Sequence, residues 1–265
     1  MANDPTDPNS VNAFAIPPVD KSNHRYLMAV KEINDRAIAC RRESDYERAI
    51  KNYSDALRID RESAALYNNR GVVHLEQNEF DLAISDFSRA LKIEPALGVA
   101  YYNRGIAWRA KKKFKRAIAD FTRTIDVMPD LAKAYNNRGE TYSARGDTDL
   151  AIKDFSKAIK LDSEFAQAYN NRAECLFISG KLAAAESDYR QALRIKPAFA
   201  VAFFNRGRLR LDKGDEDRAI ADLKKALKID PKFSSAYRLL SRLIASNSED
   251  DTVGPKKMLR TPGED

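Results

Sequence analysis

The chain has 265 residues, with 46 Lys or Arg against 39 Asp or Glu, so its formal net charge is +7. Hydrophobic residues make up 43% of the sequence, enough for a folded core, but no apolar run is long enough to span a bilayer. Only two cysteines and two histidines occur, and no glycine loop for phosphate binding is present. These features argue against a disulfide scaffold, a membrane span and an enzyme, and we expect no catalytic residues, metal or cofactor.

Residues 1–22 have no helical or strand periodicity. They contain Pro5, Pro8, Pro17 and Pro18 among Asp, Asn and Ser, a composition typical of a disordered segment. No basic and apolar leader is visible in them. A cytoplasmic location is therefore expected, or a periplasmic one if a signal peptide has been removed.

The first helix is expected from His24 to Arg42, with Ser22 or Asn23 as its cap. Ser44 and Glu47 then fit a capping box, a serine followed three residues later by a glutamate. This pattern predicts that Ser44 caps a second helix.

A five-residue motif, Tyr67-Asn68-Asn69-Arg70-Gly71, returns at a constant interval along the chain. Its further copies are residues 101–105, 135–139, 169–173 and 203–207, and residues 33–37 form a degraded copy. A fixed period of this length predicts a stacked array of supersecondary units. With the motif at positions 4–8, the repeats span 30–63, 64–97, 98–131, 132–165, 166–199 and 200–233.

Other positions of the repeat are equally regular. Position 20 is alanine in every copy: Ala49, Ala83, Ala117, Ala151, Ala185 and Ala219. Position 24 is large: Tyr53, Phe87, Phe121, Phe155, Tyr189 and Leu223. Small residues at positions 8 and 20 allow two helices to approach closely, while a large residue at position 24 fills the groove beside them. Glycine at Gly146, Gly180 and Gly214 marks turns, and proline at position 32 (Pro95, Pro129, Pro197, Pro231) ends a helix.

This pattern resembles the tetratricopeptide repeat family over about residues 30–233. The resemblance implies an all-α, right-handed superhelical solenoid of antiparallel helix hairpins. The array is expected to cover residues 23–246, including a capping helix at 234–246 that turns Tyr237, Leu240, Leu243 and Ile244 onto the last repeat. Residues 247–265 are expected to form a disordered tail.

Arginine at position 7 occurs together with aspartate at position 23 in five repeats. The pairs are Arg70 and Asp86, Arg104 and Asp120, Arg138 and Asp154, Arg172 and Asp188, and Arg206 and Asp222. Residues that vary together between internal copies suggest structural ion pairs between helices, within a repeat or to the preceding one. We favour this interpretation over a role in contacting a partner.

Asparagine at position 6 is the strongest candidate for ligand binding: Asn69, Asn103, Asn137, Asn171 and Asn205. A carboxamide presents a donor and an acceptor that match a peptide bond. The resemblance implies that position 6 faces the concave groove, as in the family branch that includes O-linked N-acetylglucosamine transferase, where a similar ladder holds an extended peptide. Position 5 would complete the groove, with Asn68, Tyr102, Asn136, Asn170 and Phe204. Alternatively, each amide bonds a neighbouring helix and regularises the stack.

The sequence therefore predicts a monomeric, non-catalytic scaffold or adaptor that binds an extended segment of another protein in its groove. Basic residues near that groove are few: Arg41, Arg109, Lys133 and Arg208. The alternative is that RNA or another polyanion binds the basic array. The basic run at residues 109–116 is either a solvated turn or a patch for such a partner.

Overall fold

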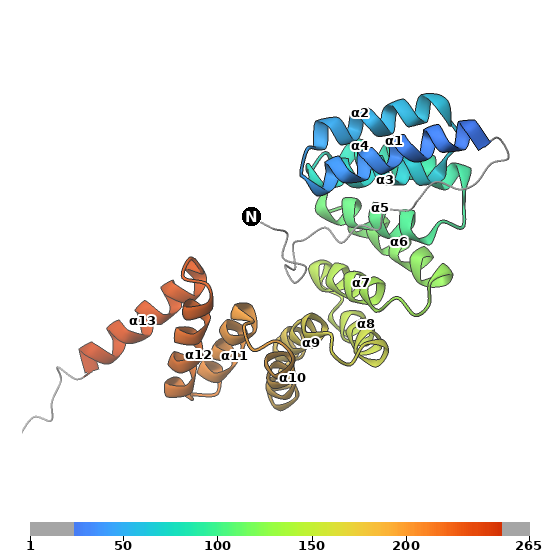
Figure 1. The fold of residues 1–265 in the computed structure, drawn as a ribbon. Helices are drawn as coiled ribbons and strands as arrows, with labels where there is room; N and C mark the ends of the chain where they lie inside the picture. The colour runs from blue at the N-terminus through green and yellow to red at the C-terminus, as the bar shows by residue number, and fades with distance from the viewer. Residues whose placement is uncertain (1–23, 251–265) are drawn as a thin grey trace, which may run out of the picture. The chain divides into compact units, whose positions relative to one another are not determined.

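The computed structural model describes residues 24–250, so the predicted N-terminal segment and residues 251–265 of the predicted tail lie outside it. The described chain is all-α, as predicted (Figure 1). Its helices are α1 (His24–Arg42), α2 (Tyr46–Ile59), α3 (Ala64–Glu76), α4 (Phe80–Ile93), α5 (Gly98–Ala110), α6 (Phe114–Val127), α7 (Ala132–Arg145), α8 (Thr148–Leu161), α9 (Ala166–Ile178), α10 (Leu182–Ile195), α11 (Ala200–Asp212), α12 (Glu216–Ile229) and α13 (Ser234–Asp250). None of these helices is long and apolar enough to cross a membrane.

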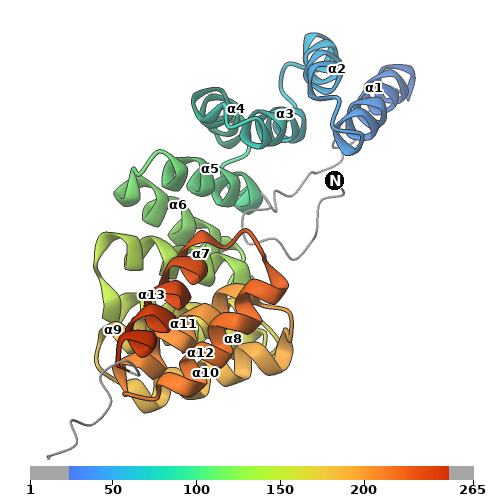
Figure 2. The ribbon, with the colours of Figure 1, turned by 90° about the vertical axis from the view of Figure 1, so that its left-hand side faces the viewer.

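The helices form consecutive hairpins, the arrangement expected of tetratricopeptide repeats. The chain divides into two compact units whose boundary, between Cys175 and Leu176, falls within α9. In the first unit α1 packs on α2, α3 on α4, α5 on α6 and α7 on α8. Figure 2 shows the hairpins α1–α2, α3–α4 and α5–α6 one after another. The first helices α3, α5 and α7 also contact each other in turn, so they form one layer, which we call the first-helix layer. In the second unit α11 contacts α10 and α12, and α12 contacts α13.

The core consists of the predicted repeat columns. All six alanines at position 20 are 0% exposed, and the six large residues at position 24 are at most 1% exposed. Both cysteines also lie on first helices and pack as small hydrophobic residues, Cys40 partly buried and Cys175 buried. The periodicity of the sequence thus identifies the inner face of each hairpin correctly.

Glycine at position 8 is required by the phenylalanine at position 24. A Cβ atom built on Gly105 would lie 2.8 Å from Cε1 of Phe121, and the same contact would occur for Gly71 and Gly139. At Gly207 the partner is Leu223, and a Cβ atom would have no neighbour closer than 3.4 Å. The close approach of the helices therefore excludes a side chain in three repeats but not in the sixth.

We expect Gly105→Ala to lower the free energy of unfolding by up to about 2 kcal/mol. Overpacking of a core costs roughly 1–3 kcal/mol, against a gain of about 1 kcal/mol in helix propensity. Gly207→Ala is the matched control and should be neutral or stabilising, since only the propensity gain applies. Chemical denaturation of both variants measures the difference. Equal effects of the two substitutions would contradict the proposed packing.

The turns between paired helices use a left-handed residue at position 15. The φ angles there are 93° at Gly146, 73° at Gly180 and 76° at Gly214, which confirms the predicted turns. Ser44 occupies the same position with a φ of 62°, so it cannot cap α2. Asp45 caps that helix instead, its Oδ1 accepting from the backbone N–H of Arg48 at 3.2 Å. The capping box predicted from Ser44 is therefore wrong.

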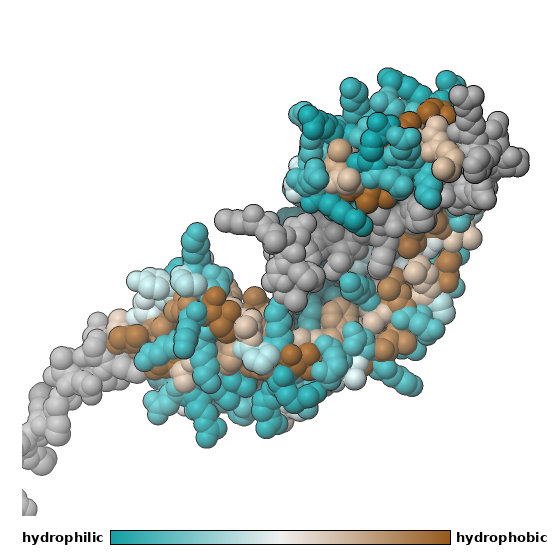
Figure 3. Space-filling view, viewed as in Figure 1, coloured by the Kyte–Doolittle hydropathy of each residue, from teal (hydrophilic) through white to brown (hydrophobic). Residues whose placement is uncertain are grey.

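The last helix, α13, differs from the prediction in length and in the face that it buries. It continues to Asp250, and Tyr237 and Ile244 are 63% and 51% exposed instead of packed. Its inner face is the stripe formed by Ala236, Leu239, Leu240 and Leu243, of which Ala236 is fully buried. A small residue at 236 allows close contact with α12, and this turns Tyr237 outward. Figure 3 shows hydrophobic residues still at the surface over α13.

Candidate functional site

The arginines at position 7 make bidentate ion pairs with the aspartates of the second helix in their own repeat. Nε and Nη2 donate to the two carboxylate oxygens at 2.7–2.9 Å in the pairs Arg70–Asp86, Arg104–Asp120, Arg138–Asp154 and Arg206–Asp222. These aspartates are at most 6% exposed. The hydrogen bond to Asp86 raises the pKa of the Arg70 guanidinium above its ordinary value, although burial opposes the shift. The cation is thus present at any physiological pH.

The same arginines reach the preceding repeat, a contact that the sequence analysis missed. Nη1 donates at 3.0 Å to a hydroxyl at position 25: Arg70 to Ser54, Arg104 to Ser88, Arg138 to Thr122 and Arg172 to Ser156. Each guanidinium also lies 5.5–5.8 Å from the ring at position 4 of its own helix. The recurrence of Ser or Thr at position 25 was a signal that could have revealed this column. Arg70, Arg104, Arg138 and Arg172 therefore join consecutive hairpins.

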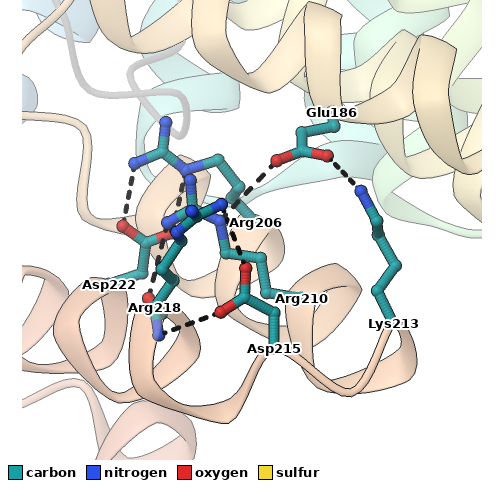
Figure 4. A network of polar contacts seen from close by, with 7 residues as sticks. All are labelled: Glu186, Arg206, Arg210, Lys213, Asp215, Arg218 and Asp222. Atoms are coloured by element: carbon teal, nitrogen blue, oxygen red, sulfur yellow. Dashed lines mark hydrogen bonds and ion pairs between the residues drawn. The ribbon is translucent and has the colours of Figure 1, made fainter.

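In the second unit the pair Arg206–Asp222 belongs to a larger network (Figure 4). Arg210 Nη1 donates to Asp222 at 2.7 Å, and Lys213 Nζ donates to Glu186 at 2.5 Å. The hydrogen bond from Lys213 lowers the pKa of Glu186 below its ordinary value. The fifth predicted pair remains a prediction, since Arg172 lies in the first unit and Asp188 in the second.

The asparagines at position 6 bond position 5 of the preceding repeat, so the two columns form one ladder. The Nδ2 donors and their acceptors are Asn69 to Asn34 Oδ1 at 3.3 Å, Asn103 to Asn68 Oδ1 at 3.0 Å, Asn137 to the Tyr102 hydroxyl at 2.8 Å and Asn171 to Asn136 Oδ1 at 3.2 Å. The ladder runs along the first-helix layer of the first unit. It matches the alternative in which the amides regularise the stack.

Burial divides the ladder into two parts. Asn68, Asn69 and Asn103 are 0% exposed, because the first helices approach closely and bond through these amides. They offer no surface to a ligand, which corrects the expectation that the whole column lines an open groove. Asn136 and Asn170 are also buried, at 4% and 3%.

The exposed part consists of Asn137 and Asn171, both only partly buried. In the second unit Asn205 is 8% exposed, and Phe204 is partly exposed and lines a cavity.

Tyr102 was expected to form a side-chain pocket, but it belongs to the core. It is 2% exposed, and its ring meets Phe121 edge-on with 6.0 Å between ring centroids. Burial raises the pKa of Tyr102 to about 12, so its hydroxyl is neutral at physiological pH. It therefore acts as a fixed, neutral acceptor that orients the Asn137 amide.

Glu140 is a site residue that the sequence analysis missed. Its Oε1 accepts from Nδ2 of Asn136 at 2.9 Å and of Asn171 at 3.0 Å, and its Oε2 pairs with Arg109. Position 9 is apolar in the first three repeats and becomes glutamate here, which was the available signal. Arg41 is likewise bound by a glutamate, with two hydrogen bonds of 2.9 and 2.7 Å to Glu76. A glutamate thus balances the positive charge of Arg41 and of Arg109.

Comparison with known proteins agrees with the fold. Residues 24–249 match the family model described as the ETO1 C-terminal domain. No curated protein sequence matches the chain significantly. One similar solved structure is YrrB, described as a TPR protein with an unusual peptide-binding site. It is 24% identical to this chain with a TM-score of 0.57, and the match covers 71% of this chain and 96% of YrrB. MamA is 25% identical with a TM-score of 0.56, over 62% of this chain and 96% of MamA.

A third similar structure is PilW, described as a widely conserved type IV pilus biogenesis factor. It is 18% identical to this chain with a TM-score of 0.73, covering 83% of this chain and 100% of PilW. At this level of identity, the similarity to YrrB and PilW shows the tetratricopeptide fold alone.

Proposed function

Because the chain belongs to the ETO1 C-terminal domain family and consists of tetratricopeptide hairpins, we propose that it is a non-catalytic scaffold or adaptor. Its ligand is an extended segment of another protein, which lies along the first-helix layer. The observation that carries this proposal is the partly exposed, fixed amide of Asn137. YrrB, a similar structure, is described as having a peptide-binding site, which supports the same class of ligand.

Asn137 is suited to bind a peptide backbone. Its Nδ2 is held by the Tyr102 hydroxyl at 2.8 Å, and no hydrogen bond to its Oδ1 comes from the described residues. A backbone N–H of a ligand can therefore donate to Oδ1 without loss of an existing bond. Asn171 lies one repeat further along the ladder, where an extended segment passes next. Because the Asn137 amide is already oriented, binding there loses little side-chain entropy.

Such contacts give modest affinity and little sequence preference. Each net hydrogen bond contributes about 0.5–1.5 kcal/mol, and ordering of a flexible segment offsets much of that gain. Discrimination between partners must then come from side-chain pockets beside the ladder.

The double variant Asn137→Ala/Asn171→Ala tests the proposal. Loss of two backbone hydrogen bonds is expected to weaken partner binding by about tenfold, while the buried amides of Asn69 and Asn103 continue to hold the stack. Quantitative co-purification with the wild-type chain, the variant and the control Asn52→Ala/Gln191→Ala measures the effect. The control removes two carboxamides from the second helices α2 and α10.

Wild-type recovery of every partner by a folded Asn137→Ala/Asn171→Ala variant would refute the role of the ladder. Loss of partners by the control as well would show that the effect is not confined to the first-helix layer. Circular dichroism of each variant establishes that the helices are intact.

A second candidate function is binding of RNA or another polyanion, favoured by a basic cavity in the first unit. The cavity has a volume of about 430 Å³ and is lined by Lys112, Lys113, Phe114, Lys115, Arg116 and Arg145. Two neighbouring carboxylates weaken this interpretation, since Asp81 pairs with Lys111 and Asp147 with Arg145. Binding to homopolymer RNA that falls steeply with salt and requires these lysines would support it. No RNA binding at low salt would exclude it.

A further inference from the structure

The second unit contains a cavity of about 490 Å³ beside the capping helix. Its apolar wall is formed by Phe177 from the end of α9, Phe204 from α11 and Leu239 from α13, all partly buried. The ring of Phe204 also packs on Phe233 with 5.0 Å between centroids, which fixes its position. A cavity of this size accommodates a large side chain together with the backbone on either side of it.

Three arginines surround the apolar wall. The Arg208 guanidinium lies 5.6 Å from the centre of the Phe177 ring and 5.8 Å from that of Phe204, so it is oriented by both rings. Arg238 and Arg242 lie one turn apart on α13 and are exposed. The lining contains one carboxylate, Asp212, so its charge is about +2 (three arginines less one aspartate).

We propose that this arginine–aromatic pocket, formed by Phe177, Phe204, Arg208, Arg238, Leu239 and Arg242, binds a polypeptide segment in which a large apolar side chain is flanked by Asp or Glu. The inference rests on the proposed function, because it names the class of segment that the scaffold binds. The apolar side chain enters between the two phenylalanines and Leu239. The acidic side chains then lie against the guanidinium groups of α13, which match carboxylates as two-pronged donors.

Two features favour an acidic peptide over other anionic ligands. A small free anion has nothing to fill the apolar wall, which would stay in contact with water. A nucleic acid would use the aromatic rings as stacking platforms for planar bases, and the aliphatic Leu239 in the same wall offers no such platform. An apolar side chain next to carboxylates uses both parts of the pocket at once.

The test measures binding of labelled octapeptides to the full chain by fluorescence anisotropy. The probe has the sequence Gly-Ser-Glu-Phe-Asp-Glu-Gly-Ser, and three matched peptides replace its Phe with Ala, its acidic residues with Lys, or its Asp with phosphoserine. We expect the probe to bind at least tenfold more tightly than the Ala and Lys peptides. Arg238→Glu/Arg242→Glu should weaken its binding at least tenfold, since carboxylates that repel the acidic probe replace two exposed guanidinium groups.

The control is Arg190→Glu/Arg194→Glu, two exposed arginines with the same spacing on α10, and its affinity for the probe should stay within twofold of wild type. Equal binding of the probe to wild type and Arg238→Glu/Arg242→Glu would overturn the proposal. Binding of the phosphoserine peptide alone would also overturn it, as would an equal loss of affinity in Arg238→Glu/Arg242→Glu and in the control. If the probe fails while partner recovery still depends on Asn137 and Asn171, the pocket assignment is wrong and the proposed function stands. If the probe binds as expected but partner recovery does not depend on Asn137 and Asn171, the proposed role of the ladder is wrong instead.

Discussion

Replacement of Asp120 by alanine is expected to lower the free energy of unfolding by about 3–5 kcal/mol. The carboxylate is buried and accepts two hydrogen bonds of 2.8 Å from Arg104, so its removal leaves a partly buried cation without its counter-charge. Breaking a buried pair from one side typically has an effect of this size. Chemical denaturation monitored by circular dichroism measures it.

The matched control is Asp126→Ala on the same helix. Asp126 is exposed and lies 3.6 Å from Arg123 in an ion pair between residues three apart. Such surface pairs contribute at most about 1 kcal/mol, and we expect a loss no larger than that. Similar losses in the two variants would mean that the arginine–aspartate column contributes no more than an ordinary surface pair.

Phe121→Ala should destabilise the protein by about 3–5 kcal/mol as well. The ring is 0% exposed, meets Tyr102 edge-on and fills the space that Gly105 leaves open, so its removal creates a cavity between two helices. Val127→Ala on the same helix is the control, because Val127 is 44% exposed and should change stability by about 0.5 kcal/mol or less. A loss for Phe121→Ala as small as the control's would contradict the assignment of position 24 to the core.

The repeat made most of the fold predictable. Its constant period determines which side chains recur at the inner face, and the alanines at position 20 and the large residues at position 24 are buried as expected. The helix α1 has the predicted bounds, His24–Arg42. The turns follow from Gly146, Gly180 and Gly214, the three glycines at the left-handed position.

The sequence was less informative about the depth of polar side chains. A column of asparagines recurs equally whether its amides face a ligand or a neighbouring helix, and only packing distances separate the two cases. Asn69 and Asn103 are fully buried, while Asn137 and Asn171 are partly exposed, although all four occupy position 6. The hydrogen-bond partners also differ, since Asn137 bonds Tyr102 and Asn171 bonds Glu140, two residues that interrupt the regular pattern.

The end of the array shows a second limit. The last helix has no further repeat to define its inner face. Two apolar stripes with helical spacing are possible in its sequence, one that begins at Tyr237 and one that begins at Ala236. The structure selects the second because alanine permits closer packing on α12. That choice leaves Arg238 and Arg242 beside the aromatic cavity.

The affinity of a purified partner segment, measured by isothermal titration calorimetry against the wild type and Asn137→Ala/Asn171→Ala, tests the proposed scaffold function most directly. Binding along the ladder predicts a dissociation constant about tenfold higher for the variant, and an unchanged one for Asn52→Ala/Gln191→Ala. Equal dissociation constants for all three proteins would contradict binding along the asparagine ladder of the first-helix layer.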